Sequence, residues 1–176
     1  KDVDGFTNQN FGSIVSDNQL ILPATPFGII ELLRRYQVET KGKHCVVVGA
    51  SRLVGAPFSM MMLAEGKATV TTCHKHTVDL ASHTRSADIL VVAVGKPGLI
   101  NGEMIKEGAV VVDVGTTRIE DPTKKSGFRL AGDVVFEEAE AKSSHITPVP
   151  GGVGPMTIAS LLLNTMKAYE NQHPES

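Results

Sequence analysis

The chain has 176 residues, of which 41% are hydrophobic and 20% charged, and its net charge is −2. This composition is typical of one globular domain that buries a core. It argues against a nucleic-acid-binding protein, because no basic run exceeds a pair, and against a membrane protein, because no apolar run approaches the roughly 20 residues that span a bilayer. Two cysteines, Cys45 and Cys73, fall within expected strands, which favours buried thiols in a reducing compartment. The first residues, KDVDGF, carry neither a Met nor a signal-peptide pattern, so we expect part of a longer protein.

The first expected helix begins at Thr25–Pro26, with Thr25 as N-cap and Pro26 at the first helical position. An apolar stripe follows at helical spacing, consisting of Ile29, Ile30, Leu33 and Tyr36. Strands are then predicted over 44–48, 68–73, 88–94 and 109–114, and helices near 55–65, 77–86, 101–107 and 135–142. Alternating strands and helices predict an α/β fold: a Rossmann-like, doubly wound, mostly parallel sheet with helices on both faces.

The last helix is expected from about Thr157. It carries apolar side chains at helical spacing, which we interpret as a core stripe: Ile158, Leu161, Leu162, Thr165, Met166 and Tyr169.

A glycine turn follows the first strand, in the stretch VVVGASRLVGAP at 46–57. Gly49 permits a tight turn, and Gly55 allows the next helix to pack close to the strand. The N–H groups at that helix's start then face the sheet edge, which predicts a phosphate or pyrophosphate site. The motif departs from G-x-G-x-x-G, so an ordinary strand-to-helix turn is the alternative.

The segment ITPVPGGVGPMT, at 146–157, has three prolines and three glycines in twelve positions. Stiff, exposed backbone suits close approach to a flat ligand, and the alternative is a plain connection between the last strand and helix. A metal site at Cys73, His74 and His76 is not favoured, because no further ligands follow at zinc-like spacing. Asp113 and Asp133 are expected to cap turns and not to act as acid or base.

Several segments together resemble one family, the methylenetetrahydrofolate dehydrogenase/methenyltetrahydrofolate cyclohydrolases. They are KDVDGF, PATPFGIIELL, GKHCVVVGASRLVGAP, ATVTTCH, KEGAVVVDVG, GDV and ITPVPGGVGPMT, in the expected order. The resemblance implies a folate cleft between a catalytic domain and an NAD(P)-binding domain. It makes 1–24 the end of a catalytic domain otherwise largely absent from this chain. It makes 25–156 the NAD(P)-binding domain, and 157–176 a helix packing back toward the catalytic domain.

The resemblance also implies roles for individual residues. Asp4 matches the aspartate that binds the pterin, whereas Asp2 is expected to be structural. Thr116 matches the residue whose backbone meets the nicotinamide amide. The glycine turn contributes Gly49, Ala50 and Ser51 beneath the cofactor phosphates, and the folate loop contributes Pro150, Gly151, Gly152, Val153 and Gly154. The family's catalytic Lys and its neighbouring Tyr match nothing here and are expected upstream, so no catalytic residue is named.

Two departures concern the cofactor. Ala50 stands where the family usually has an Arg that binds the 2′-phosphate of NADP, and Lys75 stands where it commonly has a Ser. An NAD site normally has an acidic residue after the second strand, and here that stretch is Cys73-His74-Lys75-His76. We therefore expect NADP, with Lys75 and Arg52 supplying positive charge, and NAD as the alternative cofactor.

The family's reactions are NADP-dependent oxidation of 5,10-methylenetetrahydrofolate to the methenyl compound and hydrolysis of that compound to 10-formyltetrahydrofolate. The resemblance implies these activities for the intact protein, as a homodimer acting on tetrahydrofolate derivatives. The cysteines and the absence of a signal-peptide pattern favour the cytoplasm, with the mitochondrial matrix as the alternative. This chain alone is expected to bind cofactor without turnover. Two other readings are a non-catalytic dinucleotide-binding module and a shikimate-type dehydrogenase.

Overall fold

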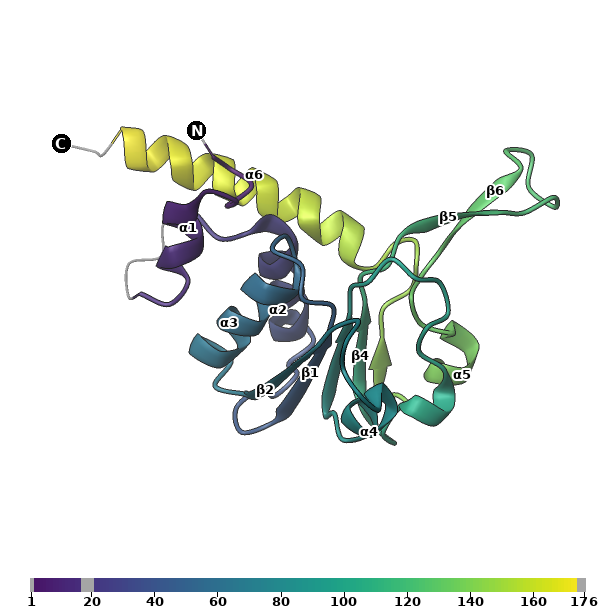
Figure 1. The fold of residues 1–176 in the computed structure, drawn as a ribbon. Coiled ribbons are helices and arrows are strands. Elements are labelled where there is room, and N and C mark those ends of the chain that lie inside the picture. The colour runs from purple at the N-terminus through teal and green to yellow at the C-terminus, as the bar shows by residue number, and fades with distance from the viewer. Residues whose placement is uncertain (1, 17–20, 174–176) are drawn as a thin grey trace.

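The computed structural model describes residues 2–16 and 21–173. Its centre is a five-stranded sheet in which every neighbouring pair is parallel (Figure 1). The strands, in spatial order, are β2 (Thr69–Cys73), β1 (His44–Val48), β3 (Ile89–Val92), β4 (Val110–Asp113) and β7 (His145–Ile146). Parallel strands buried on both faces are rich in apolar residues, which is why the sequence located β1, β3 and β4 within a few residues. The edge strand β2, of sequence TVTTC, is more exposed and was located by its β-branched residues.

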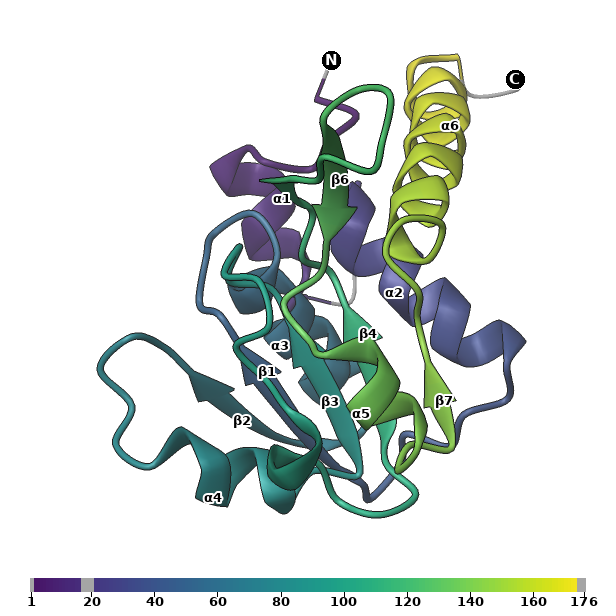
Figure 2. The same ribbon diagram turned by 90° about the vertical axis from the view of Figure 1, so that its right-hand side faces the viewer.

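Helices cover both faces of this sheet. On one face lie α2 (Ala24–Arg35) and α3 (Gly55–Ala64), and on the other lie α4 (Leu80–Arg85), the 3-10 turn Gly102–Met104 and α5 (Phe136–Glu140) (Figure 2). Successive residues of β1 enter opposite cores: Cys45 and Val47 pack with α2 and α3, and Val46 and Val48 with the other layer. The predicted doubly wound fold is thus confirmed.

The start of α2 corrects one prediction. Pro23 holds the N-cap position and the helix begins at Ala24, so Thr25 is not the N-cap. The Ala24 N–H is already satisfied by the carbonyl of Asp4, at 3.2 Å. Thr25 instead accepts a hydrogen bond from Thr157 at 3.1 Å, which ties α2 to the last helix.

The last helix, α6 (Val153–Gln172), begins four residues before the predicted start. Pro155 falls in its first turn, where a missing N–H costs no helical hydrogen bond. The expected core stripe on α6 is also wrong. Ile158 and Leu162 are each 64% exposed and Tyr169 is 65% exposed, whereas the buried positions facing α2 are the polar Ser160 and Asn164. The Asn164 amide donates to the carbonyls of Val3 and Leu22, both at 2.8 Å.

A hairpin, the N-terminal helix and the short strand β7 were not predicted. A hairpin of β5 (Thr117–Glu120) and β6 (Phe128–Ala131) projects from the body (Figures 1 and 2), with Arg118 stacked over Phe128 at 3.9 Å. Near the N-terminus, α1 (Asn8–Ser13) is capped by the Thr7 hydroxyl. The Asp2 carboxylate accepts N–H bonds from Gly5 and Thr7 there, which confirms its structural role.

None of the helices among the described residues has the length and apolarity needed to cross a membrane.

Candidate functional site

The chain reverses its winding direction at the carboxyl ends of β1 and β3. From β1 it crosses to β2 on one side, and it then returns to β3 on the other. Ligands of open parallel sheets bind in the crevice at such a switch point. The edges of this crevice are closely tied. Gly49 donates to the carbonyl of Cys73 at 2.9 Å, and Ala93 donates to that of Val48 at 2.8 Å.

The glycine turn after β1 leaves no room for side chains. Gly49 has a φ of 116°, and a Cβ there would collide with the carbonyl oxygen of Ala93. A Cβ on Gly55, the first residue of α3, would collide with the carbonyl oxygen of Gly49. The start of α3, whose N-cap residue Val54 makes no side-chain cap, therefore sits directly over the sheet edge. This cradle fits a pyrophosphate, because close backbone approach and a helix N-terminus both favour an anion.

The segment after β2 lies beside that turn, through the bond between Gly49 and Cys73. His74, Lys75 and His76 are all exposed there, and Thr77 closes the turn by accepting the N–H of His74 at 2.9 Å. Within the part of the chain that the structure describes, no group of three or more His, Cys, Asp or Glu side chains could hold a metal ion.

Arg52 extends toward the N-terminal segment. Its guanidinium donates to the Asn8 side chain of α1, at 3.5 Å. Of the two cations expected near the 2′-phosphate, Lys75 is thus the one that follows β2, whereas Arg52 extends toward the N-terminal segment.

A cavity of about 620 Å³ opens beside the carboxyl end of β4. Its walls include Val54 at the start of α3, Thr116 after β4, and the whole predicted folate loop, namely Pro150, Gly151, Gly152, Val153 and Gly154. The structure therefore brings Thr116 and this loop together next to the glycine turn. Val153 and Gly154 already belong to the first turn of α6. Asp4 does not line the cavity; its exposed side chain lies on the segment before α1, where the Asp4 carbonyl accepts the first N–H of α2.

Two buried carboxylates hold the loops of this edge. Asp113 accepts N–H bonds from Gly115 at 2.9 Å, Asp133 at 3.0 Å and Val134 at 2.9 Å. Asp133 accepts from Val94 and Gly95. Burial raises the pKa of Asp113, although these N–H bonds oppose the rise. Both residues fix turns, as predicted. Gly132 is a further sequence signal of this contact, because a Cβ there would collide with the Asp113 carboxylate.

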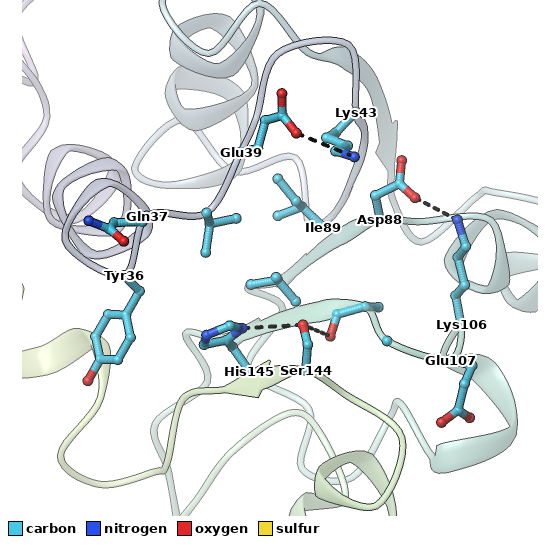
Figure 3. A pocket seen from close by; sticks show the side chains of 14 residues that line it. Tyr36, Gln37, Glu39, Lys43, Asp88, Ile89, Lys106, Glu107, Ser144 and His145 are labelled. Atoms are coloured by element: carbon cyan, nitrogen blue, oxygen red, sulfur yellow. Dashed lines mark hydrogen bonds and ion pairs between the residues drawn. The ribbon is translucent and has the colours of Figure 1, made fainter.

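A second cavity, of about 320 Å³, lies at the amino ends of the strands (Figure 3). Its lysines are already paired, Lys106 with Asp88 at 2.6 Å and Lys43 with Glu39 at 3.8 Å. Because it is at the opposite edge from the switch point, it does not contribute to the candidate site.

The two cysteines are buried and free, as predicted. Burial raises the pKa of the Cys45 thiol to about 12, and it also raises that of Cys73, whose hydrogen bond with Thr77 acts in the opposite direction. Neither thiol is suited to act as a nucleophile, since the thiolate is the reactive form.

Comparison with known proteins agrees with this geometry. Residues 23–173 match the family model of the tetrahydrofolate dehydrogenase/cyclohydrolase NAD(P)-binding domain. A bifunctional protein FolD from Chloroherpeton thalassium is 57% identical over 176 residues, covering 97% of this chain. The chain spans about 60% of that relative's length.

Solved structures give the same result. The FolD crystal structure from Trypanosoma brucei, complexed with NADP cofactor and inhibitor, superposes with a TM-score of 0.93 and 44% identity. That match covers 99% of this chain and 60% of the other. The bifunctional enzyme FolD from Campylobacter jejuni has a TM-score of 0.89 and 48% identity, over 98% of this chain and 59% of its own.

Proposed function

Since the chain belongs to the tetrahydrofolate dehydrogenase/cyclohydrolase family, of which it carries the NAD(P)-binding domain, we propose that it serves a bifunctional enzyme of folate metabolism. That enzyme oxidises 5,10-methylenetetrahydrofolate with NADP⁺, giving the 5,10-methenyl compound and NADPH. It then adds water to the methenyl compound, giving 10-formyltetrahydrofolate and a proton. The observation that carries the proposal is the family match over 23–173.

The cofactor would lie across the switch point. Gly49, Ala50 and Ser51 form the turn beneath its phosphates, and the N-terminus of α3 supplies a favourable electrostatic field. Thr116 would meet the nicotinamide amide through its backbone. The nicotinamide, when bound, is the hydride acceptor for the folate, and the residues of this chain hold it in place.

We propose NADP as the preferred cofactor, with NAD as the alternative. Lys75 stands exposed in the turn after β2, and the stretch His74–His76 has no acidic side chain to accept the ribose hydroxyls of NAD. The structure gives Arg52 less support than Lys75, because the Arg52 guanidinium binds Asn8.

The folate would occupy the 620 Å³ cavity, against the loop Pro150, Gly151, Gly152, Val153 and Gly154. Asp4 would accept hydrogen bonds from the aminopyrimidinone edge of the pterin, as a carboxylate can with two N–H groups. Because Asp4 does not line the cavity, this proposal requires the folate to extend from it toward the N-terminal segment.

We assign catalysis of both reactions to a Lys and a Tyr that we expect in the part of the relatives' length that this chain does not span. On this division, 1–24 ends the catalytic domain, 25–156 binds the cofactor, and 157–176 packs back toward the catalytic domain. The stripe of apolar side chains on α6 supports it, since Ile158 and Leu162 find no cover within the described residues.

The test is turnover by the whole protein and by the 176-residue chain. With 5,10-methylenetetrahydrofolate and NADP⁺, the whole protein should form NADPH and then 10-formyltetrahydrofolate, and the chain alone should form neither. Full turnover by the chain alone would contradict the assignment of the catalytic Lys and Tyr.

A non-catalytic dinucleotide-binding module is the second candidate, favoured by Ala50 in place of the family's Arg. A whole protein that binds a dinucleotide but forms no NADPH from the folate would establish this alternative.

We also propose a cytoplasmic homodimer. Sedimentation of the whole protein should give twice the monomer mass, and a monomer at micromolar concentration would contradict the dimer.

A further inference from the structure

Three loops of the carboxyl edge meet at one buried side chain, that of Asp133, which is fully inaccessible to solvent. Its Oδ2 accepts the backbone N–H of Val94 at 2.7 Å and that of Gly95 at 2.9 Å, in the loop after β3. The Asp133 N–H in turn donates to Asp113 at the end of β4. Asp133 therefore joins the loop after β3 to β4, across the base of the β5–β6 hairpin.

The loop held by Asp133 forms one side of the switch-point crevice. Ala93, which precedes Val94, places its carbonyl oxygen so close to Gly49 that no Cβ fits there. A Cβ on Gly49 would also lie 3.3 Å from Cγ1 of Val94. A shift of Val94 and Gly95 would consequently alter the surface on which the phosphate-binding turn rests.

The same carboxyl group supports the opposite side of the crevice. Gly115 packs on it so tightly that a Cβ would lie 2.5 Å from Cγ and Oδ1 of Asp133. Thr116 follows directly and is the proposed nicotinamide contact. Asp133 thus contacts both of the loops between which a dinucleotide would lie.

The two oxygens of Asp133 differ in their partners. Oδ2 accepts two N–H bonds, whereas Oδ1 is buried and has no hydrogen-bond partner among the described residues. An asparagine can place its one acceptor oxygen where Oδ2 lies and keep both bonds. At Asp113 this is impossible, since both oxygens accept N–H groups.

We propose that Asp133 is a positioning residue for the dinucleotide. It acts through Oδ2 on the backbone of Val94 and Gly95, and its negative charge is not required. This inference rests on the proposed function, because it concerns the same cofactor.

The experiment compares D133A and D133N with the wild-type chain. Calorimetry measures the Kd of each for NADP⁺ and NAD⁺, and amide hydrogen exchange measures protection at Val94 and Gly95. D133A should weaken both dinucleotides by about tenfold or more, and it should lose protection at those two amides while Leu90 and Val91 of β3 keep theirs. D133N should keep that protection and stay within about threefold of wild type, the range of a mild substitution.

Two results would overturn the inference alone: wild-type affinity in D133A, or a loss of affinity in D133N equal to that in D133A. If D133A does not fold, D133S takes its place. The comparison of D133N with wild type tests independently whether the negative charge is required. A wild-type chain that binds neither dinucleotide would overturn the proposed function and the inference with it.

Discussion

Buried carboxylates that accept backbone N–H groups fix the loops of the carboxyl edge. At Asp113 every oxygen is used in this way, so D113N would put an amide N–H against an N–H donor. We expect this variant to lose about 3 kcal/mol of unfolding free energy, because a buried donor and its former partner are both left unsatisfied. Urea unfolding at neutral pH measures the loss. D133N is the matched control and should lose much less, and an equal loss in both variants would contradict the assigned roles of the oxygens.

Lys75 is expected to distinguish the two dinucleotides. K75A should weaken NADP⁺ binding by about tenfold, equivalent to about 1.4 kcal/mol, because an ionic contact with the 2′-phosphate is lost. Binding of NAD⁺, which lacks that phosphate, should not change, and calorimetry with both ligands checks this. R52A serves as the comparison, with a smaller effect on NADP⁺ since Arg52 faces Asn8. An unchanged ratio of the two affinities in K75A would refute the role of Lys75.

Asp2 gives the chain an acid-dependent contribution to stability. Partial burial alone would raise its pKa, but hydrogen bonds from Thr7, Asn10 and Phe6 outweigh it and lower the pKa to about 2. Because the pKa of Asp2 is lower in the folded than in the unfolded chain, ionised Asp2 stabilises the fold at pH values above the unfolded pKa near 4. This stabilisation is lost as the pH falls toward 2. The stability difference between wild type and D2N should therefore shrink between pH 5 and about pH 2.5. A difference that is constant over this range would contradict it.

At the scale of single residues, the sequence located the turn caps but not their partners. The positions of Asp113 and Asp133 beside apolar strands indicated that each would cap a turn. The link between them depends on the path of the β5–β6 hairpin. This path brings Gly132 against Asp113, although the two residues are nineteen positions apart in the sequence. Local pattern carries no information on such a contact.

Among the elements, the buried strands were the most predictable. β3 and most of β1 and β4, at 45–48 and 110–112, are apolar runs bounded by turns, and the glycine turn marks where β1 ends. The sequence does not predict the hairpin because each of its strands has only four residues, too few for their polar/apolar alternation to stand out, and because Phe128 and Leu130 remain exposed. The two residues of β7 are too few to produce a pattern.

The predicted start of α6 is too late because the Pro/Gly-rich segment around Pro155 predicts a loop. Proline is compatible with the first turn of a helix, so the helix includes the last five residues of the twelve-residue Pro/Gly-rich segment. The core stripe failed for a different reason. Apolar spacing shows which face of a helix is hydrophobic, but it does not show whether the cover for that face belongs to the described part of the chain.

The contact between the glycine turn and α3 predicts a large cost for one methyl group. G55A should lose about 1–3 kcal/mol of unfolding free energy, because its Cβ collides with the rigid backbone of Gly49. The matched control is G12A in α1, where a Cβ meets nothing within 4 Å. This control should gain about 0.5 kcal/mol from helix propensity. Thermal unfolding of both variants tests the contact, and a neutral G55A would contradict it.

For the whole molecule, the exposed stripe of α6 predicts a difference between the chain and the longer protein. Leu162 is 64% exposed here, so L162S should change the stability of the 176-residue chain by less than about 0.5 kcal/mol. In the whole protein the same variant should destabilise clearly, because we propose that this face packs on the catalytic domain. L33A, at a position only 3% exposed, should destabilise both. Equal, small effects of L162S in both proteins would contradict the proposed packing.

The central claim is that the switch-point crevice of this chain binds a dinucleotide and prefers NADP. Calorimetric titration of the 176-residue chain with NADP⁺ and, separately, with NAD⁺ tests it most directly. We predict saturable binding at one site, tighter for NADP⁺ by about tenfold or more. A preference for NAD⁺ would contradict the cofactor assignment, and no heat from either ligand would contradict dinucleotide binding by this chain.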